Sequence, residues 1–345
     1  MTKKILFFDA VAPYEYNFDI LNKKGLGASE SYLLAVANEL KKNFDVDIAG
    51  SKVRYNYTQN DIVFKQLSLD ALDDNYNTII IQRNPNNLKV LKNKYPKAKF
   101  IIWLHDFYES SIWASISNHD LQYIIDNAQL ICVSNWHKQN YLINFKYRKI
   151  KNPKVDFIHF FIEDKKNIAE LPIDYDKNKL CFFSAGHKGL EFTLGIYEHL
   201  VRYNPNFKLY IGNPTYDQKN DFKKNDNIVN LKNQTRDQVL WHMKGSLATL
   251  HLNKDYPETF GCVNAEANLM NTPVLCFDIG ASKEILYAPF TTKQIITPNQ
   301  YRVDLNNLVH ITETIFNWRN KYPTILPNPI LDKKNILEKW IEKIL

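Results

Sequence analysis

Short apolar runs alternate with longer stretches in which apolar residues recur every three or four positions. Most of the short runs are continuously apolar, a pattern typical of parallel strands that are buried on both faces of a sheet. In the first half of the chain they predict strands at 5–8, 46–49, 78–81, 100–104, 130–134 and 155–158. In the second half they predict strands at 180–184, 208–211, 228–231, 248–252 and 274–277.

The stretches between these runs have helical spacing, as at 29–41 and 191–203. Strand and helix therefore alternate through both halves, which predicts an α/β protein with two doubly wound domains. A charged segment with weak periodicity, 162–179, separates the two sets and is the expected linker. We expect a first domain at 1–165, a second at 178–330 and an amphipathic helix at 331–345. The apolar stripe of that helix comprises Ile336, Leu337, Trp340, Ile341 and Ile344.

Composition sets few limits on function. The 345 residues are 45% hydrophobic, enough for two cores, and no apolar run is long enough to predict a transmembrane helix. The apolar stretch near the N-terminus is too short for a secretory signal, so we expect a cytoplasmic protein. The net charge of +7 does not require nucleic acid, which we do not expect as a partner, but permits an anionic substrate or a membrane surface. The cysteines lack metal-ligand spacing and are expected to be buried, reduced thiols.

Loops that follow strands are the places to look for chemistry, because doubly wound folds bind ligands at the carboxyl ends of their strands. The stretch DYPETFGCVNAEANLMNTPVLCFDIGASKEIL, 255–286, begins in such a loop, and a helix starts within it. Free amides at a helix start favour an anion such as a diphosphate, and a glycine there permits close approach to the backbone. The candidate binding positions are Thr259, Phe260, Gly261 and Cys262.

Two glutamates flank this helix start. A carboxylate accepts two hydrogen bonds from a vicinal diol, so Glu266 is a candidate for holding a ribose. Glu258, in the preceding loop, is a candidate for contacts beyond the phosphates. The alternative is that Glu258 caps the helix and that Glu266 is a solvated surface residue.

Three other loops carry candidate residues. Lys188 follows a predicted strand in FFSAGHKGLEF, with Ser184 at the strand end, and the alternative is a surface lysine in a turn. Gly27 and Ala28 lie in GLGASE, where the alternative is a tight turn with the next serine as the helix cap. His105 follows a buried strand, and the alternative is a structural histidine in the core.

Taken in register, the stretch 255–286 resembles the donor-site signature of retaining GT-B glycosyltransferases of the family 4 type. Glu258 is followed by Phe-Gly, then by a Glu-Ala pair, a Pro-Val strand and a small-residue turn that ends in glutamate. Asn271 stands where that family usually has glycine, but asparagine tolerates the left-handed backbone that such a turn needs. The arginine that usually precedes the lysine by about five residues is absent, and His187 and Arg236 are candidate substitutes.

The resemblance implies the GT-B fold, in which two Rossmann-like domains face each other across a cleft and the last helix often packs back on the first domain. It implies transfer of a sugar, with retention, from a UDP- or GDP-sugar to a hydroxyl of a glycan, lipid or protein-linked acceptor. Lys188 would bind the donor diphosphate, Gly27 and Ala28 would approach the donor from the first domain, and His105 would lie near the reacting sugar. Glu258, His105 and Lys188 are thus the catalytic candidates. No metal or other cofactor is expected, since no Asp-x-Asp follows a strand.

Other functions remain open. A non-catalytic protein that binds nucleotide or glycan can derive from this fold, and a nucleotide-sugar epimerase holds the same kind of ligand. A dinucleotide oxidoreductase is disfavoured, because GLGASE lacks the third glycine of Gly-x-Gly-x-x-Gly and lies too far after the first strand. Basic clusters at 89–99 and 146–154 are either solvated surface or contacts for an anionic acceptor or a peripheral membrane surface.

Overall fold

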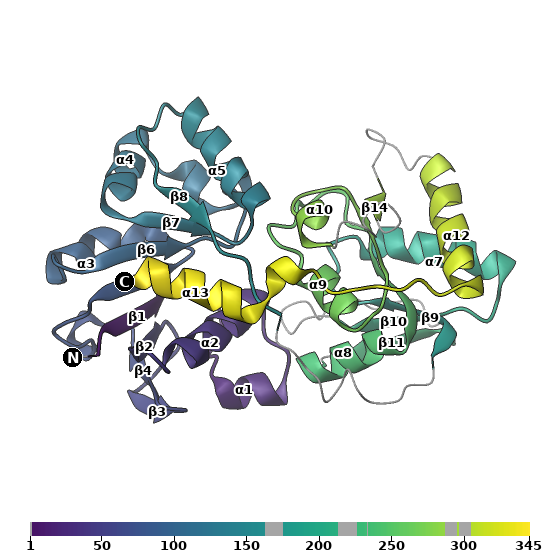
Figure 1. Ribbon diagram of the computed structural model, residues 1–345, viewed down its shortest axis with the longest axis horizontal. Coiled ribbons are helices and arrows are strands. Elements are labelled where there is room, and N and C mark those ends of the chain that lie inside the picture. The colour runs from purple at the N-terminus through teal and green to yellow at the C-terminus, as the bar shows by residue number, and fades with distance from the viewer. Residues whose placement is uncertain (1, 163–174, 213–225, 233, 287–294, 297–304) are drawn as a thin grey trace. The chain divides into compact units, whose positions relative to one another are not determined.

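The computed structural model describes residues 2–162, 175–212, 226–232, 234–286, 295–296 and 305–345 (Figure 1). The chain forms two compact units. The N-terminal unit comprises Met1–Leu21, Ala28–Phe160 and Lys333–Leu345. The C-terminal unit comprises Asn22–Gly27 and Phe161–Asp332.

Among the described residues, the N-terminal unit is built on an eight-stranded sheet with the order β3-β4-β2-β1-β5-β6-β7-β8. All neighbouring strands are parallel except β3 and β4, which form an antiparallel pair. The strands are β1 (Lys4–Asp9), β2 (Asp45–Gly50), β3 (Tyr57–Gln59), β4 (Ile62–Gln66), β5 (Thr78–Gln82), β6 (Lys99–Trp103), β7 (Gln129–Cys132) and β8 (Val155–Phe157).

Helices cover both faces of this sheet. They are α1 (Phe18–Lys23), α2 (Ala28–Leu40), α3 (Leu88–Lys94), α4 (Asn118–Asn127), α5 (Asn135–Tyr147) and α13 (Lys333–Ile344). Short 3-10 turns lie at Leu69–Ala71, Pro85–Asn87, Tyr108–Ser110 and Ile112–Ser115. Residues of α3, α4 and α5 share one core with Leu6, Phe8 and Ile102 of the strands. Successive strand residues point to opposite faces, so Trp103 faces the other side, where α13 and α2 pack together.

The described part of the C-terminal unit contains a six-stranded parallel sheet with the order β11-β10-β9-β12-β13-β14. Its strands are β9 (Asp176–Phe182), β10 (Lys208–Gly212), β11 (Ile228–Lys232), β12 (Ser246–His251), β13 (Val274–Phe277) and β14 (Ile295–Ile296). Its helices are α7 (Leu190–Tyr203), α8 (Arg236–Lys244), α9 (Cys262–Leu269), α10 (Ser282–Ile285) and α12 (Leu305–Asn320), followed by a 3-10 turn at Pro329–Leu331. Residues of α7 and α12 share the core on one face, and residues of α8 and α9 share the core on the other.

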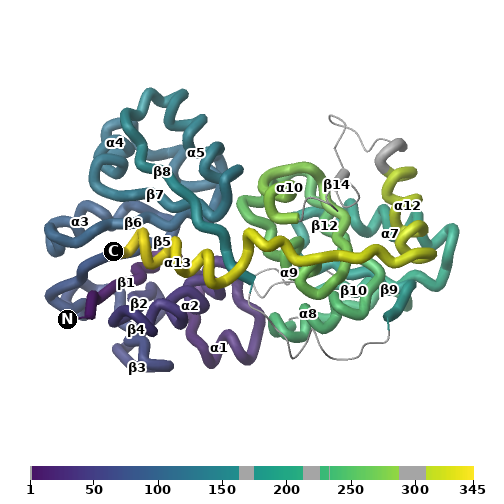
Figure 2. Tube along the Cα trace, viewed as in Figure 1, coloured from purple at the N-terminus to yellow at the C-terminus, as the bar shows by residue number. Residues whose placement is uncertain are grey.

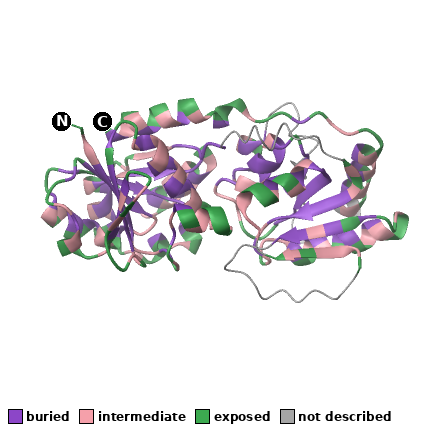
Figure 3. Cartoon of the chain, turned by 90° about the horizontal axis from the view of Figure 1, so that it is seen from below, coloured by how far each residue is buried: buried purple, intermediate pink, exposed green. Residues whose placement is uncertain are grey.

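All the strands predicted from apolar runs are present, and the prediction of an α/β protein with parallel sheets is confirmed. The reason is that the central strands of both sheets are mostly buried, whereas many helices have exposed residues along one side (Figure 3). The hairpin β3–β4 was not predicted, since its strands mix polar and apolar residues. Its turn is Asn60-Asp61, with φ of +51° and +57° at the two positions, a backbone typical of two-residue hairpins.

The expected linker, 162–179, falls partly on residues 163–174, which lie outside the described residues. Its last residues are not a linker, because β9 begins at Asp176 and Lys179 pairs with Lys208 of β10. The strand was predicted to begin later because its first residues are charged or polar.

The helix α13 completes the core of the N-terminal unit, as its path beside the strands of that unit indicates (Figure 2). Trp340 is fully buried, and its ring lies 4.8 Å from that of Trp103 at 71°. Thr78 Oγ1 donates a hydrogen bond to Ile344 O at 3.2 Å, and Lys343 pairs with Asp156 at 2.9 Å. The expected apolar stripe therefore lies against the sheet, with Leu337 and Ile341 at its half-buried margin.

Replacing Trp340 with alanine should lower the free energy of unfolding by about 3–5 kcal/mol, because the substitution removes a fully buried ring and leaves a cavity beside Trp103. Urea unfolding followed by circular dichroism measures the change. Glu338→Ala, at an exposed position of the same helix, should stay within about 0.5 kcal/mol of the parent. Equal midpoints for Trp340→Ala and the parent would contradict this packing.

Candidate functional site

The carboxyl ends of β9 and β12 lie next to each other, because these strands are neighbours in the sheet. The turn after β9 carries Lys188, and the loop after β12 carries Glu258. Lys188 Nζ donates a hydrogen bond to Glu258 Oε1 at 2.8 Å. The structure thus brings two of the predicted site residues into direct contact, at the edge of the sheet where doubly wound folds bind ligands.

Two glycines hold these segments against neighbouring backbone. Gly189 has φ +93°, and a Cβ there would lie 2.4 Å from Leu252 O. Gly280 has φ +69°, and a Cβ there would lie 2.2 Å from Glu258 O. Neither position accepts a side chain without displacement of backbone. Close packing of the two glycines therefore fixes the backbone positions of Lys188 and Glu258.

Glu258 is an ionised carboxylate with two basic neighbours. Its side chain is 16% exposed, with His251 Nε2 at 3.4 Å from the same Oε1 that Lys188 contacts. Burial raises the pKa of Glu258, but Lys188 and His251 outweigh burial and hold that pKa well below its usual range. The start of α9 is capped by Gly261, so Glu258 is not a helix cap.

Glu266 is buried on α9 and ion-paired. Arg236 Nε donates a hydrogen bond to Glu266 Oε1 at 2.9 Å. Burial raises the pKa of Glu266 above its ordinary value, and Arg236 opposes that rise. Arg236 is the first residue of α8, whose start is fixed by a capping box between Thr235 and Gln238. The alternative that Glu266 is a solvated surface residue is wrong.

The helix α9 begins as the sequence predicts, directly after Gly261. This glycine has φ +91°, which a residue with a side chain rarely adopts. Phe260 is fully buried, so only the backbone of that residue is available to a ligand. Cys262, expected to be buried, is half-buried at the first position of the helix. Asn271, which follows the helix, has φ +56°, so the expectation that asparagine takes the left-handed backbone is confirmed.

The remaining predicted site residues lie in separate places. Ser184 follows β9 at a half-buried position, and Gly27 belongs to the segment Asn22–Gly27 of the C-terminal unit. Ala28 and His105 belong to the N-terminal unit. Ala28 is the first residue of α2, so the next residue, Ser29, is already helical and does not cap the helix.

His105 is buried after β6, with its ring 4.7 Å from that of Trp103 and 5.4 Å from that of Phe160. Burial and the nearby Arg83 lower the pKa of His105 well below its ordinary value, so the imidazole is neutral. A neutral imidazole can donate or accept a hydrogen bond but supplies no positive charge.

Sequence reasoning missed a buried polar cluster at the carboxyl ends of β1 and β5. Arg83 Nη2 donates to Glu30 Oε1 at 2.9 Å, and the Tyr16 hydroxyl donates to Asp9 Oδ2 at 3.0 Å. Arg83 has φ +60°, and its carbonyl oxygen accepts a hydrogen bond from Trp113 Nε1 at 2.9 Å. Left-handed backbone at a non-glycine residue is a strain often found at functional sites. The sequence signal that could have indicated this cluster was the position of Asp9 and Arg83 at the ends of strands.

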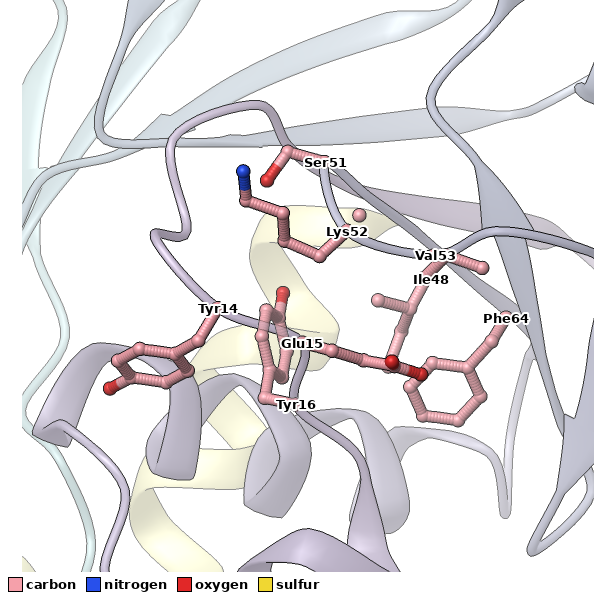
Figure 4. A pocket seen from close by; sticks show the side chains of 9 residues that line it. Tyr14, Glu15, Tyr16, Ile48, Ser51, Lys52, Val53 and Phe64 are labelled. Carbon is pink, nitrogen blue, oxygen red and sulfur yellow. The ribbon is translucent and has the colours of Figure 1, made fainter. Parts of the chain in front are cut away.

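A hollow adjoins this cluster through Tyr16 (Figure 4). It is a shallow hollow that lies where β2 ends. Its lining is formed by Tyr14, Glu15, Tyr16, Ile48, Gly50, Ser51, Lys52, Val53 and Phe64. Aromatic rings and both signs of charge therefore border one small space in the N-terminal unit.

Within the described ranges, no three His, Cys, Asp or Glu side chains are grouped so that they could hold a metal ion. None of the described helices combines the length and the apolar character that a membrane crossing requires.

No protein-family model and no curated protein sequence matches the chain. Solved structures match it over almost its whole length. HepE of Anabaena, in complex with UDP and glucose, has a TM-score of 0.66 at 14% identity and 99% coverage of both chains. Sucrose-phosphate synthase of Thermosynechococcus elongatus has a TM-score of 0.63 at 12% identity, covering 99% of this chain and 98% of the other.

AviGT4, a glycosyltransferase of avilamycin A biosynthesis, has a TM-score of 0.60 at 11% identity, covering 99% of this chain and 97% of the other. Identities this low establish a shared fold, and these structures share both units of this chain. The chain therefore has the GT-B glycosyltransferase fold that its sequence predicts.

Proposed function

We propose that the chain transfers a sugar from a nucleoside diphosphate sugar to a hydroxyl acceptor. The observation that carries this proposal is the contact between Lys188 and Glu258 beside the start of α9. An ammonium group and the first amides of a helix are both suited to bind a diphosphate. The structures of HepE with UDP and glucose, and of the pneumococcal O-GlcNAc transferase GtfA with UDP and GlcNAc, support a UDP-sugar as the donor.

In this proposal, Lys188 and the amides near Gly261 stabilise the departing diphosphate, so the transfer is metal-independent. Removing one such donor costs about 3 kcal/mol of transition-state stabilisation in comparable oxyanion sites. Glu266 holds the ribose. Arg236 supplies the positive charge that an arginine about five residues before the lysine usually provides in the family 4 type. The ion pair between Arg236 and Glu266 supports Arg236 over His187, which is exposed in the turn before Lys188.

In this proposal the acceptor binds to the N-terminal unit. The transfer retains the configuration of the anomeric carbon. Glu258 contacts the donor sugar. His105, being neutral, acts through hydrogen bonds to the sugar or the acceptor hydroxyl. Gly27 and Ala28 allow the backbone to approach the donor closely. The linkage and the acceptor, whether a glycan, a lipid or a protein-linked glycan, depend on these contacts.

A thermal-shift panel of UDP, GDP, ADP and CMP tests the donor class. One diphosphate should raise the melting temperature, because a ligand at 100 times its Kd stabilises the folded state by about 2.7 kcal/mol. Lys188→Met should abolish the shift, whereas Lys177→Met, an exposed control in the same unit, should keep it. No shift with any nucleotide would favour a glycan-binding protein, and nucleotide binding without release of sugar would favour a non-catalytic one.

Substitution of the two glutamates should separate binding from chemistry. Glu266→Gln should weaken binding of the selected nucleotide about tenfold, because it removes a charged hydrogen-bond acceptor. Glu258→Gln should bind the nucleotide at least as tightly as the parent but lower sugar release by about 100-fold or more. Calorimetry and donor hydrolysis measure the two effects, with Glu198→Gln on α7 as the exposed control. Parent-like values for both variants would refute these roles.

We also propose that the N-terminal unit contacts an anionic membrane through the end of α5. Ile143 is 67% exposed and Tyr147 is 87% exposed, and the spacing of four residues places them on one side of the helix. Lys146 and Lys149 are exposed beside them. Arg148 of the same basic cluster has partners within the unit, since it donates to the Tyr108 hydroxyl at 2.6 Å. Apolar tips surrounded by lysines suit a surface of anionic lipids.

Sedimentation with vesicles tests this contact. The parent should bind vesicles that contain phosphatidylglycerol and not vesicles of phosphatidylcholine alone, and the binding should weaken as salt rises. The variant Ile143→Ser/Tyr147→Ser/Lys146→Glu/Lys149→Glu should lose it, whereas Lys177→Glu in the other unit should not. Unchanged binding by the fourfold variant would dispose of the membrane contact.

A further inference from the structure

Behind Glu258 lies a buried chain of polar side chains that the proposed function does not use. His251 is the last residue of β12 and is 3% exposed, and Asn264 on α9 is fully buried. Asn264 Oδ1 lies 2.8 Å from His251 Nδ1, and His251 Nε2 lies 3.4 Å from Glu258 Oε1. The contacts therefore run from α9 through the imidazole to Glu258 and on to Lys188.

The chemistry of these contacts fixes the proton on Nε2. An ionised carboxylate only accepts hydrogen bonds, so the imidazole nitrogen that faces Glu258 must carry the hydrogen. Nδ1 then either donates to Asn264 Oδ1, which makes the ring a cation, or accepts from Nδ2 of a rotated Asn264 amide. Nδ2 has no hydrogen-bond partner among the described residues, so both arrangements are open to the amide. In each of them Nε2–H faces Glu258 Oε1 at 3.4 Å as an electrostatic contact, since Nε2 makes no hydrogen bond among the described residues.

The two basic neighbours of Glu258 differ in how freely they can move. Lys188 is 31% exposed and reaches Glu258 from a turn, on a long side chain. His251 is enclosed, with Asn264 on one ring nitrogen and Glu258 on the other. An arriving anion can therefore draw Lys188 away from Glu258 but cannot draw His251. A buried carboxylate that loses its only partner is costly, whereas one that keeps a second partner is not.

We propose that His251, fixed by Asn264, is a positioning residue that keeps Glu258 in place and ionised when Lys188 leaves it for the donor diphosphate. The inference rests on the proposed function, since it assigns Lys188 two successive partners. Lys188 pairs with Glu258 in the free protein and with the diphosphate in the complex. Glu258 is then held by His251 alone, with its carboxylate aimed at the space that the sugar would occupy.

The other groups near the ring do not replace Glu258 or Lys188 as charges. Cys276 on β13 pairs in register with His251, and burial raises the pKa of its thiol to about 12. Burial also raises the pKa of the Cys262 thiol at the start of α9. Both thiols are neutral near pH 7, so the described charges that face His251 are the carboxylate of Glu258 and the ammonium of Lys188.

A double-mutant cycle with inorganic pyrophosphate as the probe tests the proposal without knowledge of sugar or acceptor. His251→Gln should weaken pyrophosphate binding about tenfold, because Lys188 can then leave only by stranding a buried carboxylate. Glu258→Gln should bind pyrophosphate at least as tightly as the parent. The double variant His251→Gln/Glu258→Gln should bind like Glu258→Gln, since no carboxylate remains to be stranded. Isothermal calorimetry at pH 7 measures all four proteins, with His119→Gln, exposed in the N-terminal unit, as the control.

Recovery of pyrophosphate binding in the double variant distinguishes a positioning role from damage to the fold. If His251 were merely structural, the double variant would bind pyrophosphate as weakly as His251→Gln. Additive effects would overturn the inference and leave the proposed function standing if the parent binds pyrophosphate. A parent that binds neither pyrophosphate nor any nucleoside diphosphate would instead overturn the proposed function, and the inference with it.

A second measurement uses the unmodified histidine and does not depend on how His251→Gln folds. The ring nitrogen resonances of His251 should shift in Glu258→Gln, because the charged carboxylate that faces Nε2 is removed. They should also shift in Lys188→Met, because Lys188 contacts the same oxygen of Glu258. Resonances of His251 that are insensitive to both substitutions would refute the coupling.

Discussion

The site depends on one constraint, that carboxylates removed from water must be paired with cations. Glu258 and Glu266 lie at the same edge of the C-terminal sheet, and each has its own basic partner, Lys188 for the first and Arg236 for the second. Both partners come from segments that follow other strands, so the pairs form only once β9, β11 and β12 are assembled. Folding of the sheet and formation of the site are therefore a single event. The free protein pairs these charges internally, and under the proposed function a diphosphate competes with Glu258 for Lys188.

The two units share an architecture but differ in the charges at the carboxyl edges of their sheets. In the N-terminal unit, the guanidinium of Arg83 lies near the two buried carboxylates of Asp9 and Glu30, so no positive charge is in excess there, and His105 beside them is neutral. In the C-terminal unit, the lysine and the helix start offer positive charge to a ligand. This difference agrees with the proposed function, in which the C-terminal unit binds a charged phosphate ester and the N-terminal unit binds an uncharged hydroxyl compound.

Most of the fold could be predicted from the sequence, because strands buried on both faces leave continuous apolar runs such as those of β5 and β6. The β3–β4 hairpin could not, since only one side of it faces the core and its residues mix polar and apolar types. The motif-bearing loop indicated Glu258 and Glu266 in the same way, by local spacing. The contacts of His251 and Asn264 were out of reach, because the path of the loop between β12 and α9 decides them. Arg236 was a candidate from the sequence, but its pairing with Glu266 depends on the packing of α8 against α9. A histidine at the end of a predicted strand carries no sign that a carboxylate from the next loop will lie beside it.

The position of α13 has a consequence for how the protein is made. Ribosomes deliver residues in order, so Lys333–Ile344 emerge only after the whole C-terminal unit has been synthesised. Until then Trp103 has its contacts with His105 and Phe160 but lacks the contact with Trp340, so the core of the N-terminal unit is incomplete. A product that ends before Lys333 would therefore leave exposed the side of Trp103 that Trp340 covers in the complete fold.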